Sequence, residues 1–287
     1  MGSLYGFEVE AELPLRRLNR AAGTRGTLAV EVVNGPLVDA RGEPVSTLVG
    51  EDGRLFYASH ELNGDCLLEL PPSGEFLLEP ERDRVSVDVG DGDLDLLEHR
   101  IASSAICTLL AMRGDLVLHA SAVEDDGRAA LFCGPSRRGK STLVRALGAL
   151  GHPVLGEDGI DVALGSEPTA FPGARGVRVR LGGDSDSVEL AGDPGPEEPG
   201  ACPVGAVILL GERGRALEVE RLEPRKALAL LTPNLVHSGG RRAIGDAFAR
   251  LAQLLHSVPA FRAGLPDGLE ALPEAAADLL DGIVAPS

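Results

Sequence analysis

One stretch of fifteen residues constrains this chain more than any other, because an apolar run breaks into a glycine-bounded loop and continues as a helix-forming segment. It reads Ala129-Ala-Leu-Phe-Cys-Gly-Pro-Ser-Arg-Arg-Gly-Lys-Ser-Thr-Leu143. Gly134, Gly139, Lys140 and Ser141 occupy the fixed positions of a phosphate-binding P-loop, which lies between a strand and a helix. A tight turn with a chance Lys-Ser pair is the alternative, and it would need neither the strand nor the helix.

The residue types of this loop suit the phosphates of a nucleotide. Glycine at positions 134 and 139 lets the backbone curl so that its N–H groups point inward, and the following helix adds its positive end. Lys140 is predicted to reach the β- and γ-phosphates as a surface group with no role in the core, and Ser141 is predicted to hold Mg²⁺. We therefore predict a site for ATP and Mg²⁺ that uses the whole loop: Gly134, Pro135, Ser136, Arg137, Arg138, Gly139, Lys140, Ser141 and Thr142.

Charge and hydropathy argue against two classes of partner, nucleic acids and membranes. Its 287 residues include 44 acidic and 27 basic side chains, a net charge of −17, which opposes binding to nucleic acids and to anionic membranes. No apolar run approaches the roughly 18 residues of a membrane-spanning helix. The first seven residues lack the basic segment followed by an apolar one that marks a secretory signal. We expect a cytoplasmic protein with no nucleic-acid and no membrane partner.

The cysteines lie far apart and show no paired spacing: Cys66, Cys107, Cys133 and Cys202. Cys133 falls within the strand that leads to the P-loop. Isolated cysteines of this kind are more often buried thiols than zinc ligands or disulfide partners. We expect all four to be reduced, as suits the cytoplasm.

A change of pattern near residue 92 predicts two domains, residues 1–92 and 93–287. The first consists of short alternating apolar segments broken by turn dipeptides such as Asn34-Gly35 and Asn63-Gly64. This pattern predicts a small β-rich N-terminal domain with strands near residues 5–13, 27–33, 54–58, 66–70, 75–78 and 84–89. The segment holds no cluster of His, Cys or paired carboxylates, so substrate recruitment and simple covering of the second domain both stay open as its role.

The second domain is predicted to be α/β. Five apolar residues recur at helical spacing before Gly114, which can end a helix: Leu94, Leu97, Ile101, Ala105 and Leu109. A strand over residues 116–123, a reverse turn at 124–127 and the strand into the P-loop follow, so a hairpin precedes the loop and the sheet is expected to be mixed. Later segments predict a strand at 205–210 with a hairpin partner at 216–222, a helix at 224–231, a helix beginning near residue 243 whose apolar face includes Phe248, a strand at 261–265 and a helix at 273–281 stopped by Gly282.

Two acidic residues, Glu157 and Asp158, end a short apolar strand downstream of the P-loop. A carboxylate at the carboxyl end of a strand can reach a metal held by the P-loop serine, so Asp158 and Ser141 are predicted to share the Mg²⁺. One of the two acids is also predicted to accept the proton of the hydroxyl that receives the phosphoryl group. A solvated acidic turn is the alternative.

Positive charge gathers at few places in so acidic a chain. Arg175 precedes a predicted strand at residues 177–181 with a basic edge, and His237 precedes two further arginines in a loop. We expect five arginines to form a cleft for an anionic acceptor: Arg137, Arg138, Arg175, Arg241 and Arg242. Solvated surface arginines would give the same pattern.

Residues 182–203 differ in composition from the rest of the chain. They are rich in Gly, Pro and acidic residues and poor in large apolar side chains. Such a segment cannot offset the entropy of ordering, so we expect it to be the most mobile internal part of the chain.

The order of these motifs resembles that of the HPr kinase family, whose catalytic domain is related in fold to ATP-dependent phosphoenolpyruvate carboxykinase. The similarity runs from about Leu94 to the end of the chain and rests on His119-Ala-Ser-Ala-Val123, the P-loop and Gly156-Glu-Asp158. Phe171-Pro-Gly173 and Val258-Pro-Ala-Phe-Arg262 also look like HPr-kinase-related proteins of bacterial peptide-modification clusters, some of which phosphorylate a serine of a precursor peptide.

Two positions depart from the family pattern. Arg137 stands where the family has a glycine, and Glu157 stands where it has the first of two aspartates. The longer side chain moves the carboxylate by about one C–C bond, which at a reacting site can cost on the order of tenfold to a hundredfold in rate. The chain also lacks a clear counterpart of the region that serves reverse phosphorolysis in the bifunctional enzymes, which implies a kinase acting in one direction.

The resemblance implies a P-loop kinase domain of the HPr kinase and phosphoenolpyruvate carboxykinase type that phosphorylates a serine of a small protein or peptide. Asp158 would be the base, Glu157 would act on metal or water, and Lys140 would hold the phosphates. His119 would orient the acid or line the metal site, unless it is an inert core histidine bonded to the backbone. Two other functions stay open: a nucleotide-binding regulatory protein with weakened catalysis, and a kinase of a small metabolite such as free serine or a sugar. Homo-oligomerisation is also left open.

Overall fold

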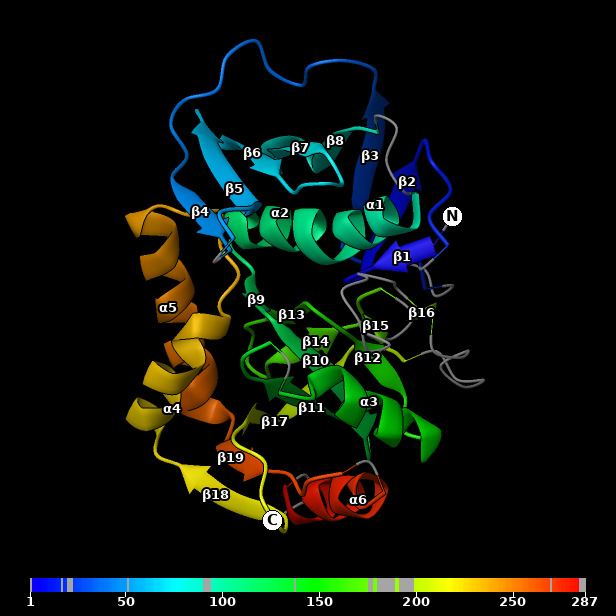
Figure 1. The fold of residues 1–287 in the computed structure, drawn as a ribbon, viewed down its shortest axis with the longest axis vertical. Helices are drawn as coiled ribbons and strands as arrows, with labels where there is room; N and C mark the ends of the chain where they lie inside the picture. Colours follow the sequence, from blue (N-terminus) through cyan, green and yellow to red (C-terminus); the bar gives the residue numbers. More distant parts are fainter. Residues whose placement is uncertain are drawn as a thin grey trace.

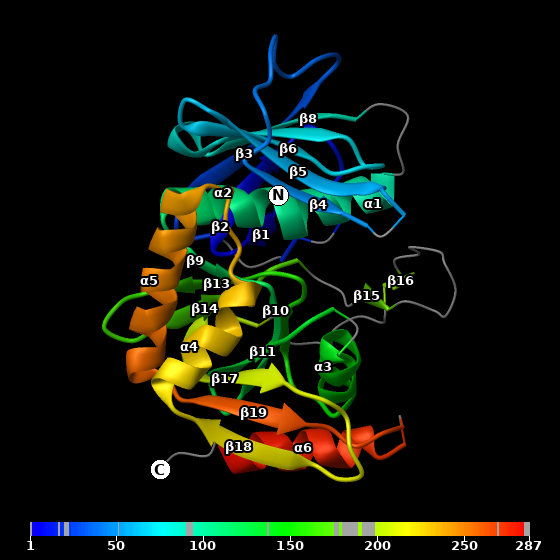
Figure 2. The same cartoon turned by 60° about the vertical axis from the view of Figure 1, so that its left-hand side comes forward.

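Two mixed β-sheets, one above the other in Figure 1, contain nearly all strands of the chain. The computed structural model describes residues 2–16, 18–19, 23–50, 52–89, 94–136, 138–174, 178–179, 189–190, 199–268 and 270–283. Helices α1 and α2 lie between the two sheets, and the other helices flank the lower sheet (Figures 1 and 2). The described chain is therefore a mixed α/β structure, as predicted.

The upper sheet is formed by the N-terminal part of the chain, in the order β1-β2-β3-β8-β7-β6-β5-β4. β3 pairs in parallel with β2 and β8, and the other neighbours are antiparallel. The β5–β6 hairpin turns at Asn63 and Gly64, which have φ angles of 51° and 102°, as an Asn-Gly turn favours. The strands are β1 (Gly2–Leu4), β2 (Phe7–Ala11), β3 (Thr27–Val33), β4 (Ser46–Val49), β5 (Leu55–Leu62), β6 (Asp65–Glu69), β7 (Glu75–Glu79) and β8 (Arg84–Asp88).

The strands predicted for this region are present, and two further strands were not predicted. β1 and β4 are short and lie at the two edges of the sheet, where a strand pairs with only one neighbour. Such a strand does not need a regular alternation of apolar and polar residues. Three residues of β4 are exposed: Thr47, Leu48 and Val49. The weak alternation at both edges explains why the sequence pattern missed them.

The helix predicted to open the second domain packs against the upper sheet. It comprises α1 (Leu94–Arg100), a π-helical turn (Ile101–Ala105) and α2 (Ile106–Arg113), and it ends at Gly114, whose φ is 105°. Its apolar residues share one buried cluster with the strands above it, including Phe76 and Val85. The boundary at residue 92 stays a prediction, but this helix completes the core of the N-terminal sheet.

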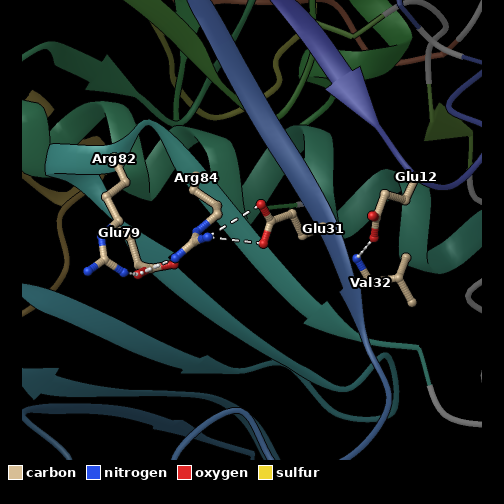
Figure 3. A network of polar contacts seen from close by, with 6 residues as sticks. All are labelled: Glu12, Glu31, Val32, Glu79, Arg82 and Arg84. Atoms are coloured by element: carbon tan, nitrogen blue, oxygen red, sulfur yellow. Dashed lines mark hydrogen bonds and ion pairs between the residues drawn. The ribbon is translucent and has the colours of Figure 1, made fainter.

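A polar network covers the face of the upper sheet opposite to that helix (Figure 3). Arg84 on β8 bonds through Nε to Glu79 Oε2 at 2.5 Å and through Nη1 to Glu31 Oε2 at 3.1 Å. The hydrogen bonds that Arg84 and Arg82 donate to Glu79 lower the pKa of this buried carboxyl group, and burial opposes them. The network joins β3, β7 and β8 across the sheet.

The lower sheet is centred on β17, which pairs in parallel with β11 and β19. Helices α3 and α6 pack on one face and α4 and α5 on the other, because alternate residues of the central strands point to opposite sides. Phe132 and Ile208 enter the α3–α6 cluster, whereas Leu131 and Val207 enter the α4–α5 cluster.

The remaining elements have the following bounds. The strands are β9 (Leu116–Leu118), β10 (Ala120–Asp125), β11 (Arg128–Cys133), β12 (Val154–Gly156), β13 (Ile160–Ala163), β14 (Thr169–Phe171), β17 (Cys202–Leu210), β18 (Glu218–Leu222) and β19 (Ala260–Gly264). β15 (Arg178–Val179) and β16 (Glu189–Leu190) pair only with each other among the described residues. The helices are α3 (Lys140–Ala149), α4 (Pro224–Leu231), α5 (Arg241–Ser257) and α6 (Leu272–Ile283).

The structure corrects two predicted strands. Residues 116–123 are not one strand, because the chain bends at His119 between β9, which pairs with β13, and β10, which pairs with β11 and β12. β18 pairs with β19 rather than with β17, because β19 lies between them. A largely apolar run identified residues 116–123 as a strand, and alternation identified residues 216–222. Neither pattern carries information about which neighbour a strand joins.

Smaller differences concern the helices. α6 continues through Gly282 to Ile283, and Phe248 on α5 is 42% exposed although its position suggested the buried face.

Most of residues 182–203, the segment expected to be mobile, lies outside the described residues, as does most of the predicted strand at 177–181.

Candidate active site

The loop between β11 and α3, predicted to bind phosphate, holds both of its glycines in positive-φ conformations. Gly134 has a φ of 143° and Gly139 a φ of 97°, conformations that residues with a Cβ rarely adopt. A Cβ at Gly134 would lie 3.2 Å from the carbonyl oxygen of Leu210, and one at Gly139 would lie 2.6 Å from Arg213 Nη2. Both positions therefore need glycine, and α3 begins directly after the loop with its unpaired N–H groups.

Lys140, the first residue of α3, is buried, whereas the sequence suggested a surface group. Its Nζ donates hydrogen bonds to the carbonyl oxygens of Gly134, at 2.8 Å, and Pro135, at 3.4 Å. Burial lowers the pKa of Lys140, and the negative charges of Asp158 and Glu157 oppose that shift. The side chain thus lies along the loop, within electrostatic reach of the acid pair.

The other residues of the predicted phosphate loop are more accessible. Pro135 and Ser136 are exposed. Arg138 Nη2 lies 3.9 Å from Glu212 Oε1 on a neighbouring loop. The two hydroxyl residues of the first helical turn are half-buried: Ser141 and Thr142. Arg137 lies outside the described residues.

The acid pair occupies the turn between β12 and β13. Glu157 is buried, and the side chain of Asp158 is 25% exposed. Asp158 has a φ of 62°, a left-handed conformation that Asp adopts more readily than most residues. A Cβ at the next residue, Gly159, would lie 2.3 Å from Cys107 Sγ, so this turn packs directly on α2.

His119 lies at the bend between β9 and β10, and the bend turns it toward the acid turn. Its Nδ1 donates to the backbone oxygen of Asp158 at 3.1 Å, and its backbone N–H donates to Asn234 O at 2.7 Å. Burial and the charge of Lys140 lower the pKa of His119, so the ring is neutral near neutral pH. The bond to a backbone oxygen is what an inert histidine would also show, but His119 in addition lines a cavity beside the P-loop.

That cavity, of about 450 Å³, contains site residues that the sequence did not reveal. Leu209, Leu230 and Pro233 give it an apolar wall, and Arg262 contributes a positive charge. Asn234 is buried at its edge, where its Oδ1 accepts the N–H of Gly134 at 2.9 Å. These residues come from β17, α4, the segment after α4 and β19, so only the pairing of distant elements brings them to the loop.

The described arginines of the predicted cleft, Arg138, Arg241 and Arg242, do not line one cavity. Arg241 and Arg242 begin α5 and line a different cavity, also of about 450 Å³, beside the β5–β6 hairpin. Of the predicted arginines, only Arg138 is among the described residues that line the P-loop cavity. Arg175 lies outside the described residues. His237 lines neither cavity and accepts a hydrogen bond from the backbone N–H of residue 239.

A second histidine, His99 of α1, contacts the acid turn and was also missed. It is buried, and its Nε2 lies 3.3 Å from Asp158 Oδ2. His99 is two positions from both Leu97 and Ile101, so it lies off the apolar stripe that identified the helix. The helix is covered on two sides, so a polar residue off its apolar stripe can also be buried. That position of His99 would have been the one signal in the sequence.

The N-terminal part of the chain supports the strand after the acid turn. The guanidinium of Arg25 lies between the rings of Phe7 and Phe171, 4.6 and 4.5 Å from their centroids. It forms ion pairs with Asp161 and, at 2.9 Å, with Asp115. Burial and the charge of Asp115 raise the pKa of Asp161 to about 7, and Arg25 opposes the shift.

All four cysteines are free and buried, as predicted. Burial raises the pKa of each thiol to about 12. No helix in the described part of the chain is long and apolar enough to cross a membrane.

No known protein family and no curated protein matches the sequence. One solved structure to which the chain is similar is that of the Hpr(Ser) kinase/phosphatase from Coxiella burnetii, at 16% sequence identity. The match covers 58% of this chain and 94% of that one, with a TM-score of 0.35. A score of this size does not establish a common fold.

Proposed function

We propose that the protein is an ATP-dependent, Mg²⁺-assisted kinase that transfers the γ-phosphoryl group to a hydroxyl, with a serine of a small protein or precursor peptide as acceptor. One observation carries the proposal. A loop with two glycines in positive-φ conformations, Lys140 and an acid turn held by His119 meet at one place between β11, α3 and β12. Phosphoryl transfer requires mainly such positioning and neutralisation of charge.

The described residues fit both groups that the reaction needs. Gly134 and Gly139 hold φ angles of 143° and 97°, and the backbone curvature that these angles give suits phosphate oxygens. Ser141, Asp158 and Glu157 offer oxygen ligands, which Mg²⁺ prefers. No group of three or more His, Cys, Asp or Glu suited to a metal is found among the described residues, as fits an ion held partly by substrate phosphates. Bound Mg²⁺ would neutralise charge on those phosphates.

Each residue then has a defined task. Lys140 turns from the neutral carbonyl oxygens of the loop to the β- and γ-phosphates, so its two hydrogen bonds are exchanged for bonds to ionised acceptors. The oxygen of the acceptor hydroxyl bonds to the γ-phosphorus, and the bond from that phosphorus to the bridging oxygen breaks. Asp158 accepts the proton that the hydroxyl loses. Glu157 acts on metal or water, and His119 holds the turn by donating to the backbone of Asp158.

The cavity beside the loop supports an acceptor larger than a metabolite. Its wall is partly apolar, and Arg138 and Arg262 lie on it. A peptide segment with an apolar residue and a nearby carboxylate would match these groups. The serine specificity itself rests on the sequence resemblance to HPr-kinase-related proteins.

The test is incubation with γ-labelled ATP, Mg²⁺ and candidate acceptors. Label on a peptide or protein serine, lost in Lys140→Ala, would support the proposal. Nucleotide binding without transfer to any acceptor would identify a regulatory protein instead. Transfer to free serine or to a sugar, with none to peptides, would identify a small-molecule kinase.

A further inference from the structure

His99 is held beside the acid turn by features of its own helix. It lies on the last turn of α1, immediately before the π-helical turn Ile101–Ala105. A π-helical turn contains one more residue than a regular turn, so it changes which residues of the helix face a neighbour. Ser103 Oγ donates to the backbone oxygen of His99 at 2.7 Å, which satisfies a carbonyl group that a π-helical turn displaces.

The distance between this helix and the acid turn is fixed by tight packing one to two turns farther along, at Ala102 and Cys107. The missing side chain of Gly159 makes room for Cys107 Sγ, and Tyr5 fills the space beside them. The hydroxyl of Tyr5 donates to the backbone oxygens of Ala102, at 3.1 Å, and Gly159, at 3.4 Å. Helix and turn therefore cannot move apart without breaking buried contacts, and the 3.3 Å approach of His99 to Asp158 is part of this packing.

We propose that His99 is a positioning residue for the carboxylate of Asp158: its Nε2–H donates to Oδ2 and fixes the rotation of the carboxylate about the Cβ–Cγ bond. His119 holds the backbone of the same residue, so the two histidines, from α1 and from the bend after β9, act on the two parts of one aspartate. This inference rests on the proposed function, in which Asp158 accepts a proton. A carboxylate displaced by about 1 Å can cost on the order of a hundredfold in rate.

Three variants test the role through turnover. His99→Ala is expected to lower kcat by about tenfold to a hundredfold while KM for ATP stays within about threefold, because the loop that binds phosphate is not touched. His99→Gln, which keeps a donor near the position of Nε2, is expected to recover most of the loss. His60→Ala is the matched control. His60 is equally buried in the N-terminal sheet and bonds to Gly42 O and Glu69, so its loss should lower the melting temperature and leave kcat within about twofold.

All rates are compared at a temperature where circular dichroism shows each variant to be folded. If His99→Ala lowers kcat no more than His60→Ala, or if His99→Gln recovers nothing, the positioning role is wrong. A wild-type protein that transfers no phosphoryl group to any acceptor would instead overturn the proposed function.

A second measurement examines the contact without using activity. In protein labelled with ¹⁵N-histidine, Asp158→Asn is expected to shift the Nε2 resonance of His99 and to leave both ring resonances of His60 in place. An unchanged His99 signal would show that the hydrogen bond does not exist, and it would overturn this inference whether or not the protein is a kinase.

Discussion

The two halves of the candidate site are built in opposite ways. The phosphate loop comes from one stretch of chain, and its internal contacts are short in sequence: Lys140 bonds to a carbonyl group six residues before it. The acid turn is held by residues that are far away in sequence, and Tyr5, for example, lies 154 positions from Gly159. Apart from the hydrogen bond of the Gly134 N–H to Asn234, the first half depends on local backbone conformation. The second half depends on the packing of the N-terminal sheet and helix α1–α2 against the lower sheet.

This difference separates the expected effects of substitution. Under the proposed function, a change in the loop would remove an interaction with phosphate and leave the packing of the molecule nearly intact. A change around the acid turn would alter both the position of the proposed base and the contact between two sheets, so rate and stability should fall together. Four predictions test this contrast, in order of decreasing effect.

Lys140→Ala should show the largest loss of activity. Removal of the ammonium group from the phosphates is expected to lower kcat/KM for ATP by at least about 10³-fold. Among the described residues, Lys140 Nζ donates two hydrogen bonds, both to loop carbonyl groups, and their loss should change the free energy of unfolding by about 1 kcal/mol. Arg145→Ala, at an exposed position on the same helix, is the control and should match the wild type in rate and stability. A Lys140 variant that loses activity only as far as it unfolds would contradict the local character of this half.

Asp158→Asn should lower kcat by about a hundredfold while the affinity for ATP stays within a few-fold, because a base acts on the transition state. Glu157→Gln should have a smaller effect. Steady-state kinetics for both variants, with the exposed turn variant Asp126→Asn as control, would measure the difference. A larger loss for Glu157→Gln would reverse the roles assigned to the two acids.

Gly159→Ala should destabilise the protein by about 1–3 kcal/mol, because the new methyl group would lie 2.3 Å from Cys107 Sγ. Adding Cys107→Ala should recover part of that loss, and urea denaturation of both single variants and the double variant measures the coupling. Gly42→Ala, where a Cβ would meet no atom within 4 Å, should be nearly neutral. Additive single effects would mean that the turn does not rest on α2 as described.

The smallest effect concerns the dependence of stability on pH. Because the pKa of Asp161 is raised to about 7, the folded protein binds more protons than the unfolded chain between about pH 4 and pH 7. Its stability should therefore fall as the pH rises through this window. Relative to Asp161→Asn, the wild type should lose about 1 kcal/mol between about pH 5.5 and pH 6.5, as measured by urea denaturation. Parallel curves for the two proteins would show that Arg25 keeps this aspartate charged throughout.

The same contrast explains what the sequence could predict. The loop, the hairpin before it, the position of the acid pair and the end of α2 at Gly114 follow from local signals: glycine spacing, a turn dipeptide, alternation and helical periodicity. The break at His119 and the pairing of β18 with β19 depend on which strands meet in the folded sheet, and no local pattern contains that information.

The missed site residues follow the same rule. His99, Asn234 and Arg262 belong to three elements that are separated by more than the length of any motif, and each looks like an ordinary polar residue in its own segment. Conversely, Arg241 and Arg242 attracted interest because of their charge alone, and the structure places them beside the β5–β6 hairpin. Charge identifies a candidate, but only tertiary packing decides which cavity it lines.

Because all four thiols are buried, the rate at which each one is labelled measures how often its part of the molecule opens. A thiol reacts with an alkylating reagent only after it becomes accessible and ionised, so its labelling rate reports how often its surroundings open. Cys66 lies in the upper sheet, Cys107 between α2 and the acid turn, Cys133 before the phosphate loop and Cys202 at the start of β17. Labelling of Cys107 before Cys133 would mean that the two sheets separate while the lower one stays closed. The acid turn would then leave the candidate site before the loop that precedes α3 unfolds.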